Sequence, residues 1–244
     1  MGQLIAVLSG KGGTGKTSVC AGIASTLAQM GEKVLCIDCD PGLRNLDIAL
    51  GIAELGALSF LEVSESGYGL DKATVHPLYP TLHFLTAPIN CAAEDVDADA
   101  FGAMLSLARE QYSYIFLDAA SGIGAGFRLA AQFADRVMVV TGADPASIRN
   151  AGRVAEVLEL MGKENVRLVI NRITKKTLSA VHLTVDDIMD HTGLPLLGIV
   201  PEDPDMLLAA VSKQPLPAYT RKGAAAACSR IAKLLQGQNV PVSL

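Results

Sequence analysis

Short runs of aliphatic residues recur along the chain, and longer stretches with helical spacing separate them. The apolar runs occupy residues 4–8, 33–37, 82–85, 114–117, 136–140, 166–170 and 197–200. They are continuously apolar rather than alternating, which is typical of parallel strands covered on both faces. The stretches between them, rich in Ala, Leu and Met, occupy residues 16–30, 95–111, 127–134, 145–161, 185–191 and 221–235. We predict that the first set forms strands and the second set helices.

This alternation of strands and helices predicts a doubly wound α/β fold, with a mostly parallel sheet and helices on both faces. Pro145 and Thr184 are residues typical of helix starts, and Gly162 and Gly237 are typical of helix ends. In such a fold, ligands bind at the carboxyl ends of the strands. The residues that follow each strand are therefore the first place to look for chemistry.

Composition narrows the class of protein. Half of the 244 residues are hydrophobic and 18% are charged, which suits a compact domain with a large aliphatic core. The formal net charge is −5 and no block of Lys and Arg is present, so we expect no direct binding of nucleic acid. No apolar run approaches the roughly 18 residues of a membrane-spanning helix, and the N-terminus lacks a secretory pattern. We expect a cytoplasmic protein.

The cysteines indicate reduced thiols rather than a disulfide framework. Their number is odd and they lie in apolar segments, at Cys20, Cys36, Cys39, Cys91 and Cys228. Cys36 and Cys39 have the spacing of a redox or metal pair, although no second set of ligands lies nearby in the sequence. The alternative is that both are small residues at the end of a strand.

A glycine-rich turn follows the first predicted strand and opens the first predicted helix. Residues 10–17, GKGGTGKT, fit the phosphate-binding pattern of Gly, four variable residues, Gly, Lys and Ser or Thr. Glycines allow positive φ and close backbone approach, so that successive N–H groups converge on phosphate oxygens. Lys16 then supplies a charge to the β- and γ-phosphates, and the Thr17 hydroxyl is suited to Mg²⁺.

A dinucleotide site is the competing interpretation of this turn. A glycine-rich turn followed by an acid at the next strand end also describes such a site, with Asp38 as the ribose ligand. The Lys-Thr ending argues against it, because a hydride-transfer site has no use for those two residues. A second glycine series at residues 121–126 is weak by itself, since no acid follows it in the required place.

Acidic residues stand at two of the predicted strand ends. Asp38 and Asp40 follow the run at 33–37, and Asp118 follows the run at 114–117. A nucleoside triphosphatase needs carboxylates near the Mg²⁺ and the attacking water, and a parallel sheet supplies them from strand ends beside the loop. For Asp118 the alternative is a solvated acid that begins a loop.

Several blocks together resemble the MinD/ParA family of deviant Walker A ATPases. The family's loop carries an additional lysine, which is Lys11 here, and the segments 38–47, 118–123 and 198–203 are similar to the family's switches and its base-binding turn. These blocks extend over almost the whole chain. The resemblance implies a single P-loop ATPase domain over residues 1–244, with 237–244 as a short, poorly ordered tail.

The resemblance also implies roles for individual residues. It implies that ATP and Mg²⁺ are cofactors and that a homodimer forms in the ATP state, in which Lys11 reaches the partner's phosphates. Asp40 would orient the attacking water. The implied catalytic residues are Lys11, Lys16 and Asp40, and the implied metal-binding residues are Thr17, Asp38 and Asp118. The implied nucleotide-binding residues are Gly10, Lys11, Gly12, Gly13, Thr14, Gly15, Lys16, Thr17, Ser18, Asn171, Arg172, Pro201, Glu202 and Asp203.

Within that set, the resemblance implies that Asn171 reads the adenine, with Arg172 beside it. The turn at 201–203 would pack on the base. A simpler alternative for Asn171 is a cap after a strand, because Asn is frequent in caps.

The chain departs from the family pattern at three places. A proline of the second switch is Ala120 here and a following acid is Gly124, and residues 149–150 are Arg-Asn where the family usually has an acid linked to regulation. These changes leave the identity of protein regulators open. After the stretch 221–235 the chain has no basic amphipathic segment, which argues against direct membrane binding unless a partner supplies the anchor.

We therefore expect an ATP-dependent, dimerising switch in cell-division site placement. Three alternatives remain at this point. They are an ATP-binding scaffold with negligible hydrolysis, a positioning ATPase for flagella or chromosome partition, and an iron–sulfur carrier of the same superfamily.

Overall fold

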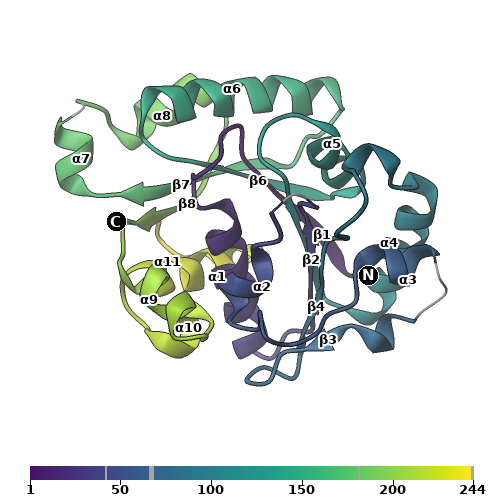
Figure 1. The fold of residues 1–244 in the computed structure, drawn as a ribbon. Helices are drawn as coiled ribbons and strands as arrows, with labels where there is room; N and C mark the ends of the chain where they lie inside the picture. The colour runs from purple at the N-terminus through teal and green to yellow at the C-terminus, as the bar shows by residue number, and fades with distance from the viewer. Residues whose placement is uncertain (42, 66–68, 181, 243–244) are drawn as a thin grey trace.

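The computed structural model describes residues 1–41, 43–65, 69–180 and 182–242, and Figure 1 shows its fold. Over these residues, eight strands form one sheet in the order β3-β4-β2-β5-β1-β6-β7-β8. The strands are β1 (Gln3–Leu8), β2 (Val34–Cys39), β3 (Thr74–Val75), β4 (Leu82–Leu85), β5 (Tyr114–Ala119), β6 (Arg136–Thr141), β7 (Val166–Ile173) and β8 (Leu196–Pro201). Neighbouring strands pair in parallel except β3 and β4. Gly42 of the predicted switch and residues 243–244 of the predicted tail lie outside the described residues.

Helices cover both faces of the sheet, as a doubly wound fold requires (Figure 1). The first face carries α3 (Phe60–Glu65), α4 (Ala98–Gln111), α5 (Ala125–Phe133), α6 (Pro145–Leu160) and α8 (Val185–Thr192). The second face carries α1 (Lys16–Gln29), α2 (Leu46–Leu50), α9 (Asp205–Val211), α10 (Leu216–Tyr219) and α11 (Gly223–Leu235). The helix α7 (Lys175–Ala180) and two short 3₁₀ turns, η1 (Leu70–Lys72) and η2 (Ala93–Asp95), complete the described elements. The predicted fold class is confirmed.

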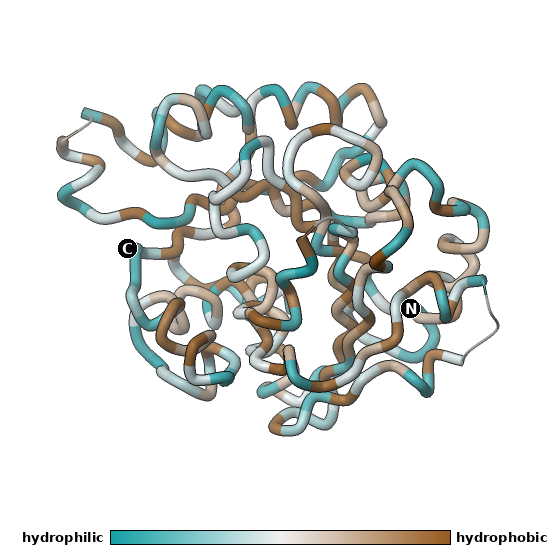
Figure 2. The backbone as a smooth tube through the Cα atoms, viewed as in Figure 1, coloured by the Kyte–Doolittle hydropathy of each residue, from teal (hydrophilic) through white to brown (hydrophobic). Residues whose placement is uncertain are grey.

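Alternation along the central strands explains how one strand serves two cores. In β2, Leu35, Ile37 and Cys39 belong to the core on the first face, whereas Val34 and Cys36 belong to the core on the second. Figure 2 shows this hydrophobic interior as brown segments through the middle of the molecule. Cys36 and Cys39 therefore point to opposite faces of the sheet. The interpretation of this pair as a shared metal or redox site is wrong.

Every predicted strand and helix is present, with ends displaced by a few residues. The predicted helix termini are confirmed. Thr184 and Asp187 form a reciprocal capping box, and Pro145 follows the N-cap residue of α6. Gly162 and Gly237 have φ of 71° and 82° after their helices, a conformation that glycine adopts without a Cβ penalty.

Three strands, β2, β5 and β7, continue at their carboxyl ends by two or more residues beyond the predicted runs, and the difference changes the surroundings of polar residues. Asp38 lies within β2, Asp118 within β5 and Asn171 within β7, and all three are buried. The alternatives of a solvated loop acid for Asp118 and a strand-end cap for Asn171 are therefore wrong. The strand β3 and the helices α2, α3, α7, α9 and α10 are too short to show a period, and the sequence did not predict them.

None of the helices in the described part of the chain is long and apolar enough to cross a membrane.

Candidate functional site

The glycine loop joins the end of β1 to the start of α1. Gly13 and Gly15 have φ of 81° and 83°, which only glycine adopts readily, and Lys16 is the first residue of the helix. A Cβ atom on Gly10 would lie 2.6 Å from the carbonyl oxygen of Asn150, so the loop packs closely against α6. The loop thus presents backbone amides at the positive end of α1, as a phosphate-binding loop does.

Two carboxylates lie beneath the loop, side by side. Asp38 of β2 is paired in register with Asp118 of β5, and the alternation of both strands turns these side chains toward the face that carries α1. Lys16 Nζ donates to Asp118 Oδ1 at 2.6 Å and lies 3.3 Å from the Thr17 hydroxyl. The side chains of Lys16 and Asp118 are only 6% and 2% exposed. A buried ion pair therefore connects the loop to the sheet.

Burial controls the ionisation of both acids. Burial, together with the nearby charge of Asp118, raises the pKa of Asp38 to about 7, although its carboxylate accepts N–H groups from Asp40 at 2.9 Å and Leu46 at 3.1 Å. Burial also raises the pKa of Asp118, against the lowering effect of the Lys16 ammonium. Burial and mutual repulsion make negative charge on these two adjacent carboxyl groups unfavourable. A further cation bound at this position would therefore be stabilised by them.

Asp40 opens onto a cavity of about 340 Å³ beside the loop. The loop residues from Gly12 to Ser18 line the same cavity, together with Ser121. The sequence did not predict the apolar wall of this cavity, which α2, α9 and neighbouring segments supply through Leu43, Ile48, Ala49, Met206, Ala209, Ala210 and Leu216. The structure therefore brings Asp40 and the phosphate-binding loop to one hollow.

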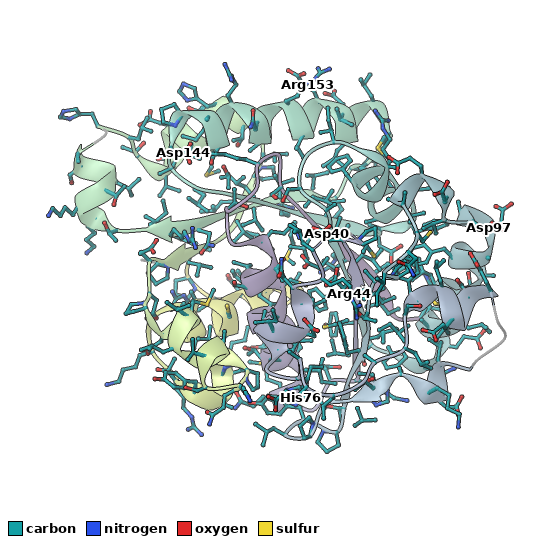
Figure 3. All side chains as sticks on the ribbon, viewed as in Figure 1. Asp40, Arg44, His76, Asp97, Asp144 and Arg153 are labelled. Atoms are coloured by element: carbon teal, nitrogen blue, oxygen red, sulfur yellow. The ribbon has the colours of Figure 1, made fainter. Side chains whose placement is uncertain are left out.

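Lys11 lies on the exposed side of the loop, where its ammonium makes an ion pair with Asp144. The distance from Nζ to Oδ1 is 2.9 Å, and the side chains are 43% and 49% exposed. Asp144 is also the N-cap of α6 and accepts the Ser147 amide. Hydrogen bonds from Ser147 and Lys11 lower the pKa of Asp144 to about 2. Figure 3 labels Asp40 and Asp144, both far from His76 at the bottom of the view.

Asn171 and Arg172 of β7 contact the backbone of the loop. Asn171 Nδ2 donates to the Thr14 carbonyl at 2.8 Å, and Arg172 Nη1 donates to the Gly13 carbonyl at 2.9 Å. Their predicted contact with adenine stays a prediction.

The predicted base-binding turn begins at Pro201, the last residue of β8. The Glu202 amide donates to Ile173 of β7 at 3.1 Å, and the Asp203 carboxylate accepts the Ala224 amide at 2.7 Å. These two bonds fix the turn to β7 and to α11. Ile173, which accepts the first bond, directly follows Asn171 and Arg172 in β7. These turn residues do not line the cavity that holds Asp40. Their contact with a base also stays a prediction.

The site combines a buried strand, a glycine loop that ends in Lys-Thr, a following helix and a carboxylate on the neighbouring strand. This combination defines a nucleotide-binding protein with a phosphate-binding loop. Comparison with known sequences places the chain more narrowly. Residues 5–216 match the family described as the CobQ/CobB/MinD/ParA nucleotide binding domain, and the chain belongs to this family.

Within this family, the chain is similar to MinD proteins. The chain is 33% identical to the septum site-determining protein MinD of Synechocystis sp., over 99% of this chain and 92% of the relative. It superposes on the MinD cell division protein of Aquifex aeolicus with a TM-score of 0.89 and 30% identity, over 99% of this chain and 100% of that one. The MinC:MinD complex of the same organism gives a TM-score of 0.91 and 31% identity, over 99% and 98%. The resemblance inferred from the sequence motifs is confirmed.

Proposed function

We propose that this chain is a MinD-type ATPase. It binds Mg-ATP, forms a homodimer with nucleotide between the subunits, and hydrolyses ATP slowly as a spatial switch in division-site placement. Membership of the nucleotide-binding family supports the first step, and the similarity to MinD proteins supports the last. The observation that carries the proposal is that the phosphate-binding loop, including Thr17, and Asp40 line the same cavity.

The residues around Lys16 fit a magnesium ion. Thr17, Asp38 and Asp118 offer only oxygen atoms, which are the ligands that Mg²⁺ prefers. When bound, Mg²⁺ neutralises charge that develops on the phosphate oxygens. Lys16 binds the β- and γ-phosphates, and for this its ammonium moves from Asp118 to the nucleotide. Asp118, left without its lysine, is then available to the metal.

Asp40 and Lys11 serve the chemical step. Asp40 faces the cavity beside the loop, where a carboxylate can orient the attacking water. Lys11 is half-exposed on the outer side of the loop, so that its ammonium can leave Asp144 and reach the nucleotide of a second copy. A cation delivered from the partner stabilises charge on the transferring phosphoryl group, as an arginine finger does.

We also propose that the switch acts through protein partners. The Aquifex MinD structure in complex with MinC supports a partner of that kind. Ala120, Gly124 and the Arg149-Asn150 pair, where the sequence departs from the family pattern, are expected to alter the contacts with regulators.

Two measurements on purified protein test the proposal. Size-exclusion chromatography with light scattering should give a dimer with MgATP and a monomer with MgADP. Steady-state phosphate release should fall to background in Lys11→Ala and Asp40→Ala. Arg153→Ala, on the exposed face of α6, is the matched control and should behave as wild type.

The alternative of an ATP-binding scaffold predicts a different pattern. In that case ATP still produces the dimer, but wild type releases phosphate no faster than either site variant. A wild-type protein that binds no nucleotide at all would refute both functions.

A further inference from the structure

Two neighbouring residues of β7 hold two neighbouring carbonyl groups of the phosphate-binding loop. Asn171 donates to Thr14 and Arg172 donates to Gly13, at 2.8 and 2.9 Å. The first contact is buried, since Asn171 is 2% exposed, and the second lies at the surface. Both donors come from one strand, β7, and neither residue lines the cavity beside the loop.

The geometry of the peptide bond links the direction of these two carbonyls to the direction of the amides that follow them. The bonds that join Gly13 to Thr14 and Thr14 to Gly15 are trans. In a trans peptide unit, the C=O of one residue and the N–H of the next point in opposite directions. Because Asn171 and Arg172 hold the two carbonyls toward β7, the amides of Thr14 and Gly15 are directed away from β7, and both residues line the cavity beside the loop.

The structure around these two side chains is adapted to the close approach. A Cβ on Gly15 would lie 2.2 Å from Asn171 Nδ2, so the amide reaches the loop only because residue 15 is glycine. Arg172 has φ of 58°, an unfavourable conformation for a residue with a side chain. The pairing of β7 with β8 is irregular between Ile170 and Ile173, around these residues. Such local strain persists where the surrounding structure enforces it, and it clusters at functional sites.

We propose that Asn171 and Arg172 are positioning residues that pre-orient the amides of Thr14 and Gly15 toward a bound phosphate chain. The inference rests on the proposed nucleotide binding and gives these residues a role toward the phosphate chain, which does not depend on a contact with the base. A loop whose amides already converge loses less conformational freedom when an anion binds. Removal of either donor therefore weakens binding of any phosphate chain, whether or not it carries adenine.

Isothermal titration calorimetry with MgADP and with inorganic tripolyphosphate separates the two roles. Arg172→Ala and Asn171→Leu should each weaken both ligands by a similar factor, about tenfold, which is the effect of one lost hydrogen bond from a charged or buried donor. Arg172→Lys, which keeps a cationic donor, should recover part of the loss. Arg167→Ala, an exposed arginine of the same strand, is the matched control and should bind both ligands as wild type does.

The glycine variant of residue 172 separates strain from hydrogen bonding. Arg172→Gly removes the side chain but accepts positive φ, so it should fold at least as stably as Arg172→Ala and bind tripolyphosphate equally weakly. If Asn171→Leu does not fold, judged by its thermal melt, the exposed Arg172 variants decide the question alone.

Two results overturn the inference. The first is weaker MgADP binding with unchanged tripolyphosphate binding, which assigns the residues to the base. The second is unchanged binding of both ligands in the Arg172 variants. Failure of the proposed function looks different, because the wild-type protein would then bind neither MgADP nor tripolyphosphate.

Discussion

The ionisation of Asp38 gives the most quantitative prediction for the nucleotide-free protein. Asp38 is 1% exposed, and burial beside Asp118 raises its pKa from 3.8 to about 7. The folded protein therefore holds a proton on this carboxyl group over a pH range in which the unfolded chain has lost it. Asp38→Asn removes the titration and keeps the size and shape of the side chain.

The sign and size follow from linkage. A carboxyl group whose pKa is raised by folding contributes most stability below its unfolded value, and this contribution disappears as pH rises through the folded value. A shift of about 3 units corresponds to about 4 kcal/mol over the whole window, from about pH 4 to above pH 7. Between pH 5 and pH 8, roughly 2 to 3 kcal/mol of this change should occur.

Urea unfolding at several pH values between 5 and 8 measures this effect. The free energy of unfolding of wild type should fall with rising pH more steeply than that of Asp38→Asn. The absolute free energies of the two proteins also differ because Asn keeps a single oxygen for the amides of Asp40 and Leu46, so the slopes are compared. Asp47→Asn, which changes a half-buried acid in the first turn of α2, is the matched control and should follow the wild-type slope.

Parallel profiles for wild type and Asp38→Asn would refute the reasoning. They would mean that Asp38 titrates at the same pH in the folded and unfolded states. The burial of two adjacent carboxyl groups under the loop would then be compensated in the nucleotide-free protein, and the argument for a cation at this position would lose its electrostatic basis.

Three further predictions concern the loop. Lys16→Met should abolish MgATP binding in calorimetry and lower the free energy of unfolding by about 3 to 5 kcal/mol, because Asp118 keeps a buried charge without a partner; wild-type affinity would contradict this. Lys11→Ala should change that free energy by less than about 1 kcal/mol, because its ion pair with Asp144 is exposed, while ATP binding persists and phosphate release stops. Gly15→Ala should abolish nucleotide binding and lower the melting temperature, because residue 15 has φ of 83° and no room for a Cβ; an unchanged melt would show that the loop relaxes freely.

Local sequence patterns were enough to predict the central strands, the long helices and the phosphate-binding loop of this protein. The strands of the central sheet were predictable because short, continuous apolar runs are typical of parallel strands covered on both faces. The long helices were predictable because their apolar spacing repeats over several turns. The phosphate-binding loop was predictable because all of its residues are contiguous, at positions 10–17. The motif needs only its flanking strand and helix to be interpreted.

Tertiary structure decided how the site is held together. Lys11 meets Asp144 across 133 residues, and Asn171 reaches Thr14 across 157. The register of β2 against β5 places Asp38 beside Asp118 and buries both acids, which isolated sequence segments do not show. Chain segments so far apart meet only through the packing of the whole sheet, and a shift of one residue in register would turn a side chain to the opposite face. For this reason the sequence predicted which residues bind phosphate, whereas the fold determined how those residues are oriented and how the two buried acids ionise.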